Sequence, residues 1–320
     1  MNRPAAAESR RGLIYALGSY LIWGLLPLYF ALLIGLNPFE IVAWRILLTL
    51  VFCAFLLTVT KSWAQVGAVF RDRALLGRLA LAGAIIYVNW QTYVIASVSG
   101  HILDASLGYF INPVVTILLA VVILGERLTR VQWFALAVTV LAFAVIAIGY
   151  GTFPWIALLL ALSFGVYGFL KKGVGDRVGA LPGLFVETVV LTPVALVILG
   201  ILAGTRGLDV LSAPPGLLAV LAFSGAVTGL PLILFAAGAR RLPLVALGFT
   251  QYLAPSLMFL VGWLILGEQV PLARWIGFSL VWAALIVLSV ETIRMVRRNR
   301  GQLPEDPATG PATGPISGLL

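Results

Sequence analysis

Two charged residues lie well inside long apolar segments, and they are the first candidates for chemistry in this chain. Arg45 stands about five residues beyond Glu40 in one apolar segment, and Glu187 stands about six residues into another. At about 1.5 Å per helical residue, these depths are roughly 7 Å and 9 Å. A charge at such depth in a bilayer costs roughly 2.5–3.5 kcal/mol and usually serves a function. We expect both side chains to bind a polar ligand or to control access to it.

A structural explanation stays open for the same two residues. Arg45 would then extend its guanidinium toward the nearer interface, and Glu187 would accept hydrogen bonds from a neighbouring helix. Glu40 is a poor partner for Arg45, because residues five apart point about 140° away from each other around a helix. Glu187 is the only carboxylate well inside an apolar segment, so any coupling to protons should pass through it.

Aromatic and amide side chains form a second candidate set. Asn89 and Tyr93 are four residues apart, and Tyr109 and Asn112 are three apart, so each pair shares one helix face. Such residues could enclose an amphipathic cavity for a planar or weakly polar molecule, although Tyr and Trp also pack helices and form belts at membrane interfaces. The set comprises Trp23, Asn89, Trp90, Tyr93, Tyr109, Asn112, Tyr167, Gln251 and Tyr252.

Two prolines occupy equivalent places in the two halves of the chain. Pro113 and Pro255 interrupt apolar segments, and a proline inside a helix removes one backbone donor. We expect each to act either as a hinge or as a static kink.

Composition shows where these residues must be held. Hydrophobic residues make up 61% of the chain and charged residues 10%, and the mean hydropathy is +1.07. A soluble domain carries about 25% charged residues. A single cysteine, Cys53, excludes a disulfide scaffold. The composition therefore indicates an all-α membrane protein.

Apolar runs long enough to cross a bilayer, about 20 residues each, occur ten times. Their continuous apolar character favours helices over the alternating strands of a barrel. The predicted spans are 13–34, 41–60, 79–98, 105–124, 131–149, 153–170, 181–203, 216–238, 243–266 and 273–293. Between the second and third spans, Trp63, Val66 and Phe70 recur at helical spacing and predict a short interfacial helix.

Basic residues predict the orientation of these spans. If the N-terminus is cytoplasmic, 18 of the 21 Lys and Arg residues fall on the cytoplasmic side, among them Lys171 and Lys172. Both termini are then cytoplasmic. The net charge of +9 mostly reflects this bias and calls for no nucleic-acid partner.

The chain also resembles itself. Pro113, Gly125, Glu126 and Trp133 are each matched 142 residues later, by Pro255, Gly267, Glu268 and Trp275. Each half would hold five helices, and because five is odd the second half enters the bilayer from the opposite face, an arrangement found in transporters. The predicted division is a cytoplasmic N-terminus over 1–11, five-helix repeats over 12–150 and 151–296, and a disordered cytoplasmic tail over 297–320.

Short motifs in both halves carry a resemblance to a known family. They are Asn89-Trp90, Ser106-Leu107-Gly108-Tyr109-Phe110-Ile111-Asn112-Pro113, Gly125-Glu126-Arg127-Leu128, Tyr167-Gly168, Phe185-Val186-Glu187-Thr188 and Leu247-Gly248-Phe249-Thr250-Gln251-Tyr252. Over residues 12–296 the chain is similar to the RarD transporters, in the EamA branch of the drug/metabolite transporter superfamily. This resemblance implies ten helices in two EamA repeats, and export or import of small organic solutes, with a link by name to chloramphenicol. The chain has Trp44-Arg45 where relatives often have His-Arg, so any role of that imidazole is absent here.

These observations predict an inner-membrane carrier that moves a small organic solute by alternating access through a cavity between the repeats. Its expected partners are the lipid bilayer and a small-molecule substrate, with no cofactor or metal, and a homodimer stays open. The alternatives are a solute channel, which needs a charged ring or carbonyl filter, and a membrane-embedded enzyme. Catalysis is disfavoured because the chain has one His and its Asp residues fall in predicted connections.

Overall fold

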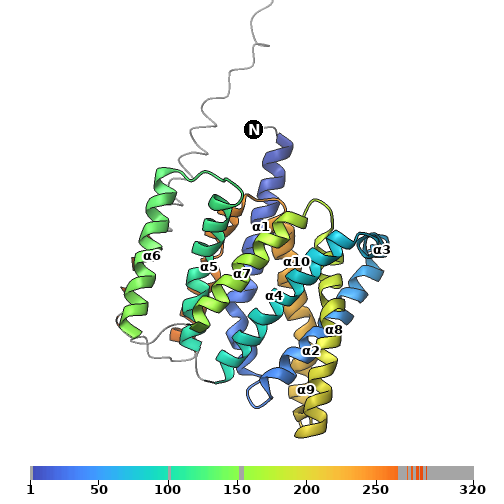
Figure 1. The fold of residues 1–320 in the computed structure, drawn as a ribbon. Coiled ribbons are helices and arrows are strands. Elements are labelled where there is room, and N and C mark those ends of the chain that lie inside the picture. Colours follow the sequence, from blue (N-terminus) through green and yellow to red (C-terminus); the bar gives the residue numbers. More distant parts are fainter. Residues whose placement is uncertain are drawn as a thin grey trace, which may run out of the picture.

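The described part of the protein is a bundle of helices. The computed structural model describes residues 3–99, 102–150 and 155–265, with eight single positions between 272 and 286. These residues contain no strand. The helices run mostly along one direction, with the N-terminus at one end of the bundle (Figure 1).

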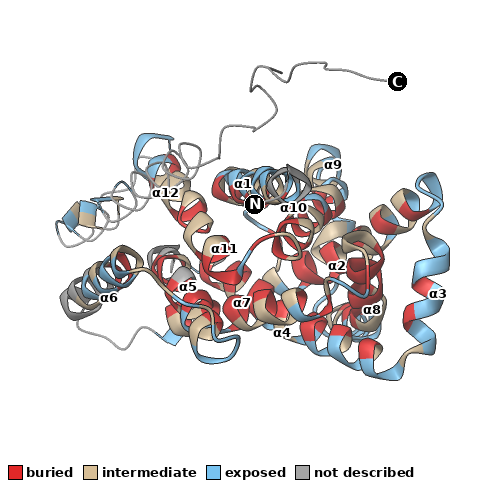
Figure 2. Ribbon diagram, turned by 90° about the horizontal axis from the view of Figure 1, so that it is seen from above, coloured by how far each residue is buried: buried red, intermediate tan, exposed pale blue. Residues whose placement is uncertain are grey.

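The first half of the chain forms six helices. Most of them are long, and a short one, α3, lies at an edge of the bundle in Figure 2. The helices are α1 Arg3–Ala31, α2 Pro38–Val59, α3 Trp63–Arg71, α4 Arg73–Val98, α5 Ile102–Val122 and α6 Arg130–Tyr150.

The second half is more interrupted. Two of its predicted spans are built from shorter pieces placed end to end in sequence. The elements are α7 Trp155–Val174, α8 Ala180–Thr205, the 3₁₀ turn η1 Asp209–Leu211, α9 Pro215–Ala222, α10 Ser224–Ala239, α11 Leu244–Thr250, α12 Leu253–Leu260 and the π-helical turn η2 Val261–Ile265.

Nine of the ten predicted spans fall on these helices. Among the described residues, seven helical segments are long and apolar enough to cross a membrane, and α5 and α6 contribute the shorter apolar stretches Leu107–Val122 and Arg130–Leu141. The predicted span 273–293 and the tail 297–320 lie outside the continuously described residues. Helix α1 begins at Arg3, so it includes most of the segment predicted as a cytoplasmic N-terminus.

Local capping explains several helix boundaries. The Asn37 side chain accepts from the backbone nitrogens of Phe39 and Glu40, at 2.8 and 3.3 Å, and starts α2. Asp72 does the same for α4, accepting from Leu75 N at 3.0 Å. Gly125, with φ +66°, ends the turn after α5 in the left-handed conformation that glycine adopts without strain.

The ninth predicted span is interrupted next to Pro255, which the sequence predicted to be a hinge or a static kink. Helix α11 ends at Thr250 and α12 begins at Leu253, and Gln251 and Tyr252 between them form a turn that keeps right-handed helical backbone angles. Pro255 has no N–H with which to bond the Gln251 carbonyl four residues earlier, and Ala254 N bonds that carbonyl instead, at 3.2 Å. The break therefore follows from the missing donor.

Helices of the first half pack mainly against helices of the second. Helix α1 lies against α10 and α12, α2 lies against α8 and α10, and α7 lies between α4 and α5. Buried residues gather along these contacts, as Figure 2 shows. Two glycines permit the closest approaches of one helix backbone to another: a Cβ on Gly225 would lie 2.3 Å from Leu48 O, and one on Gly108 would lie 2.7 Å from Ala157 O.

Candidate functional site: a cavity between the two halves

A small cavity lies at the centre of the bundle. Its volume is about 40 Å³, room for only a few water molecules at roughly 10–15 Å³ each. Helices α1, α2, α4 and α5 line it from the first half, and α7, α12 and the α11–α12 break line it from the second. The lining residues are Tyr20, Trp23, Leu26, Arg45, Asn89, Trp90, Tyr93, Tyr109, Asn112, Phe164, Gln251, Ala254, Pro255 and Met258.

The cavity brings together most residues that the sequence nominated. Eight of the eleven predicted ligand-binding residues line it, from four helices and the α11–α12 break. The three that do not are Tyr167, Glu187 and Tyr252. Pro255, one of the two predicted hinges, also lines the cavity, and residue 113 lies within α5.

Arg45 is the cationic residue of the cavity wall. Its side chain is only 4% exposed, and its Nε donates to Thr228 Oγ1 of α10 at 3.0 Å. The guanidinium carbon lies 5.1 Å from the centre of the Phe30 ring and 5.4 Å from that of Trp90, which is cation–π distance. The buried Nη1 atom has no hydrogen-bond partner. The charge is thus held by aromatic faces and one hydroxyl group.

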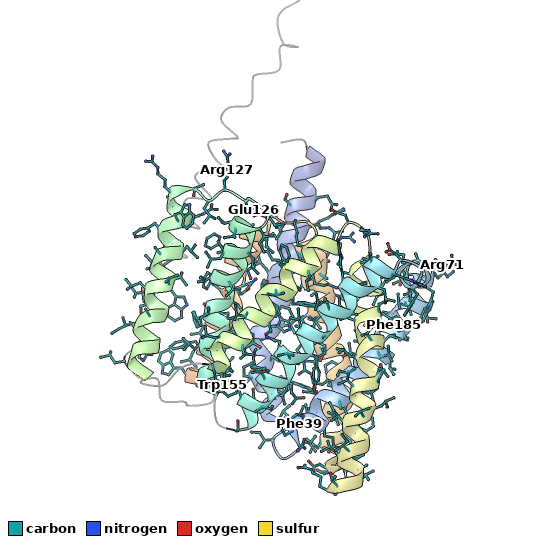
Figure 3. All side chains as sticks on the ribbon, in the orientation of Figure 1. Phe39, Arg71, Glu126, Arg127, Trp155 and Phe185 are labelled. Carbon is teal, nitrogen blue, oxygen red and sulfur yellow. The ribbon has the colours of Figure 1, made fainter. Side chains whose placement is uncertain are left out.

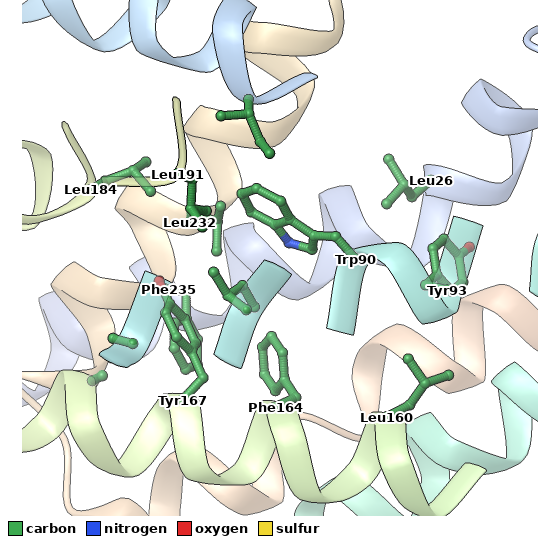
Figure 4. Close-up of a cluster of buried hydrophobic side chains, with 14 of the residues drawn as sticks. Leu26, Trp90, Tyr93, Leu160, Phe164, Tyr167, Leu184, Leu191, Leu232 and Phe235 are labelled. Atoms are coloured by element: carbon green, nitrogen blue, oxygen red, sulfur yellow. The ribbon is translucent and has the colours of Figure 1, made fainter. Parts of the chain in front are cut away.

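Aromatic rings close the cavity toward the end of the bundle that carries the N-terminus. Phe164 lies 5.2 Å from Trp23 and 5.2 Å from Phe235, and Tyr167 stacks on Phe235 at 5.9 Å, all between ring centres. Figure 4 shows Phe164, Tyr167 and Phe235 side by side, with Trp90 nearby. The inner aromatic layer is the name used below for Tyr20, Phe164, Tyr167 and Phe235.

A second group of rings covers the other side. Tyr93 lies 5.4 Å from Phe30 and 5.5 Å from Tyr109, both in edge-on contacts. These three rings are called the outer aromatic layer. Aromatic pairs in such arrangements stabilise packing by about 0.5–1.5 kcal/mol each, so both layers contribute to the packing around the cavity.

The three amide residues of the cavity connect helices. Asn89 of α4 donates to Leu160 O and to Ser163 Oγ of α7, each at 3.0 Å. With its amide nitrogen turned toward α7, Asn112 reaches Ala161 O at 2.9 Å. Gln251 donates to Thr116 Oγ1 of α5 at 3.0 Å. Their donors therefore hold helices together across the cavity.

Glu187 lies beyond the inner aromatic layer and is paired with a cation. Its Oε1 accepts from Lys171 Nζ at 2.6 Å, its Oε2 accepts from Tyr167 OH at 3.2 Å, and it is only 1% exposed. The predicted span ended at residue 170, before Lys171, but α7 continues to Val174 and Lys171 is 3% exposed. Burial of this lysine follows from the carboxylate opposite it.

Tyr252 faces a different cluster from the cavity. It is 1% exposed and packs with Phe110 and Phe259. This residue follows Gln251 at the helix break, so the break directs the two neighbouring side chains to different surroundings.

Five lining residues were absent from the sequence prediction: Tyr20, Leu26, Phe164, Ala254 and Met258. Four of them carry no polar group to single them out among many apolar neighbours. Tyr20 could have been found, because it lies three residues before Trp23 and so shares its helix face.

Polar contacts join the two halves at each end of the bundle. At the end away from the N-terminus, Glu40 accepts from Asp209 N at 2.8 Å and from Val210 N at 3.0 Å, and Asp209 accepts from Asn37 N at 2.6 Å. At the other end, Arg177 pairs with Asp72. Asn37, Glu40, Asp209 and Val210 form the outer tie, and Asp72 and Arg177 form the inner tie.

Further polar contacts join the two halves at the same end of the bundle as the inner tie. Arg241 donates to Glu8 at 2.9 Å, and Glu126 accepts from the backbone nitrogens of Leu244 and Val245 at 2.8 and 3.0 Å. A carboxylate at these two donors stabilises the N-terminus of α11. An open hollow of about 640 Å³ lies at this end and reaches residues of the α7–α8 and α10–α11 connections.

Among the described residues, no group of three His, Cys, Asp or Glu side chains could hold a metal ion. The cavity itself contains one cation, three amides and a majority of apolar and aromatic groups. This set can bind a small, partly apolar molecule.

Comparison with known proteins defines the class. The model of the EamA-like transporter family matches the chain twice, over residues 10–148 and 153–290. The chain therefore belongs to the EamA-like transporter family, and it is a multi-pass membrane protein.

Its relatives include proteins named RarD. Protein RarD of Streptomyces exfoliatus is 42% identical over 300 residues, which cover 93% of this chain and 94% of that protein. Protein RarD of Escherichia coli K12 is 36% identical over 293 residues, 92% of this chain and 98% of that one. A solved crystal structure aligns with a TM-score of 0.64 at 18% identity, over 89% of this chain and 98% of the other. That alignment supports the fold.

Proposed function

We propose that this protein is a secondary carrier that moves a small organic solute across the inner membrane by alternating access through the central cavity. The observation that carries this proposal is the cavity itself, which lies between the two halves of the chain and is lined by both. Carriers place their substrate site near the middle of the membrane, at the interface between repeats.

The proposed architecture is ten membrane helices in two inverted repeats. The twofold match to one family model supports the duplication. Helix packing supports a two-fold relation between the halves, because exchanging the halves exchanges equivalent contacts: α1 against α10 corresponds to α7 against α4, and α2 against α10 corresponds to α8 against α4. The contact of α2 with α8 corresponds to itself. Such a pattern is expected around a two-fold axis, and the odd number of helices proposed for each half places that axis in the membrane plane.

The proposed orientation places both termini in the cytoplasm. Arg71 and Arg127 lie toward the end of the bundle from which α1 starts, whereas Phe39 and Trp155 lie toward the opposite end (Figure 3). Basic residues gather on the cytoplasmic side of membrane proteins. The inner tie and the open hollow are then cytoplasmic, and the outer tie faces the other compartment.

Alternating access follows from the closures on the two sides of the cavity. The inner aromatic layer and the inner tie would separate to open the cavity to the cytoplasm, and the outer aromatic layer and the outer tie would separate to open it outward. At about 40 Å³, the cavity is far smaller than ligand pockets of about 300–1,000 Å³. The solute would therefore enter only after one side has opened.

Flux through the purified protein in liposomes tests this function. A panel of metabolites and antibiotics is offered as labelled solute, with an excess of the same unlabelled solute on the opposite side. A carrier gives saturable uptake that the unlabelled solute accelerates, because the loaded site returns faster than the empty one. Uptake that stays proportional to concentration and is unaffected by the opposite pool would instead identify a channel.

A further inference from the structure

Arg45 carries a positive charge in the cavity that no side chain among the described residues neutralises. Arg45 is 4% exposed and lines the cavity, and none of the ion pairs formed by the described residues includes it. Its Nη1 atom is buried without a hydrogen-bond partner. A buried cation left in this state is costly, and a complementary anion relieves that cost.

The other buried charged residues do not compete for this role. Glu187 is taken by Lys171, at 2.6 Å, beyond the inner aromatic layer. Glu40 is used by the backbone nitrogens of Asp209 and Val210. The lining residues include no carboxylate, so Arg45 is the one fully charged side chain among the residues that line the cavity.

We propose that the transported solute is an organic monoanion, a carboxylate on a planar aromatic body, and that Arg45 binds its carboxylate. This inference rests on the proposed carrier function and specifies its substrate class. One guanidinium neutralises one negative charge, whereas the second charge of a phosphate monoester would stay unpaired in an apolar cavity. Guanidinium groups suit carboxylates because their donors match the two oxygens.

The rest of the wall suits the aromatic body. The cavity is lined by the aromatic rings of Trp23, Trp90, Tyr93, Tyr109 and Phe164. Planar molecules pack well on such rings. The donors of Asn89 are already used by α7. An amino acid would fit less well than the plain carboxylic acid, because its ammonium group would meet no carboxylate among these residues.

Binding to the purified full chain in detergent tests the inference without requiring transport. The probes are benzoate and indole-3-acetate, with benzamide as the neutral isostere of benzoate, phenyl phosphate as a dianion and phenylalanine as a zwitterion. The readout is the ligand concentration that shifts thermal unfolding. We expect the carboxylates to bind roughly 10- to 100-fold more tightly than benzamide, the range expected for hydrogen bonds to a charged group, and more tightly than phenyl phosphate or phenylalanine.

Two variants assign the preference to Arg45. Arg45→Gln should bind benzoate and benzamide equally, and Arg45→Lys should keep part of the preference because it keeps the charge without the paired donors. Arg206→Gln is the matched control, because it removes a cation that is 47% exposed and paired with Asp209. If Arg45→Gln does not fold, Arg45→Lys and the wild-type comparison of benzoate with benzamide decide.

Equal binding of carboxylate and amide by the wild type, or an unchanged preference in Arg45→Gln, would overturn the proposal. Preferential binding of phenyl phosphate or of phenylalanine would overturn it as well. Carboxylate binding that depends on Arg45, without accelerated exchange in liposomes, would leave this inference standing and refute the carrier function. Accelerated exchange of neutral or cationic solutes alone would support the carrier function and refute this inference.

Discussion

Lys171 and Glu187 form a buried ion pair that connects α7 to α8, and Tyr167 donates a further hydrogen bond to the same carboxylate. Taking two charges out of water is costly, so such a pair contributes little net stability while both partners are present. Removing one partner leaves the other charge buried and unpaired. The pair therefore constrains how α7 and α8 pack beyond the inner aromatic layer.

Substitution of one member of the pair should destabilise the protein more than substitution of both. Glu187→Gln and Lys171→Met are each expected to lower the free energy of unfolding by about 3–5 kcal/mol, and the double variant should recover most of this loss. Thermal unfolding of the four proteins in detergent measures the difference. Additive effects of the two substitutions would show that the side chains are not coupled.

The sequence predicted Glu187 as an intramembrane charge but not its partner. Lys171 precedes Lys172 at the end of an apolar run, which is the usual pattern of a cytoplasmic boundary. Helix α7 continues through both lysines to Val174, and only the three-dimensional packing of α8 makes one of them a core residue. The spacing of Tyr167 and Lys171, four residues apart on one face, was the available signal.

At the scale of elements, close backbone contact between the halves depends on small residues. Gly225 of α10 leaves no space for a Cβ against Leu48 of α2, and Gly83 of α4, 142 residues earlier, approaches the backbone of Glu187 in α8. Small residues at helix interfaces of membrane proteins permit such approach. Gly225 and Gly229 could be selected from their spacing, but not the helix that they contact.

Gly225→Ala should destabilise the bundle. The added methyl group would overlap Leu48 O at 2.3 Å, and overpacking of this kind costs about 1–3 kcal/mol. Gly200→Ala in α8 is the matched control, because nothing lies within 4 Å of its added Cβ. Thermal unfolding in detergent compares the two, and an equal or smaller loss of stability in Gly225→Ala would contradict the packing described here.

The break between α11 and α12 is the element best placed to move. Pro255→Ala restores the N–H that can bond the Gln251 carbonyl, so the two short helices could join. We expect slower exchange in liposomes with a smaller change in ligand binding, because Arg45 and the aromatic residues of the cavity wall are kept while the hinge is stiffened. An unchanged exchange rate would indicate that Pro255 is a static kink.

For the whole molecule, apolar runs were sufficient to predict the all-helical fold. Nine predicted spans coincide with helices, because about 20 apolar residues between charged boundaries leave a membrane chain few alternatives. The interruption at Phe223 was not predicted, since no proline or charge marks it. Most polar and aromatic residues of the cavity wall could be predicted from the sequence, whereas its aliphatic residues could be identified only from the tertiary structure.

The two ties at the ends of the bundle should each limit transport when they are fixed. In a Cys53→Ala background, the pair Asn37→Cys with Asp209→Cys can be joined across the outer tie by a short flexible cross-linker, and Asp72→Cys with Arg177→Cys across the inner tie. Either link should abolish exchange in liposomes, because both ends must open in each cycle. Normal exchange with either link in place would refute the role of that tie.

Alternating exposure of the cavity is measured most directly by labelling a cavity cysteine from each side of the membrane. Met258→Cys in the Cys53→Ala background is treated with a membrane-impermeant thiol reagent in oriented vesicles. We predict labelling from either side in the unlinked protein, from the cytoplasmic side alone when the outer tie is linked, and from the outer side alone when the inner tie is linked. Labelling from both sides with either link in place would contradict the account, because the cavity would then be an open pore.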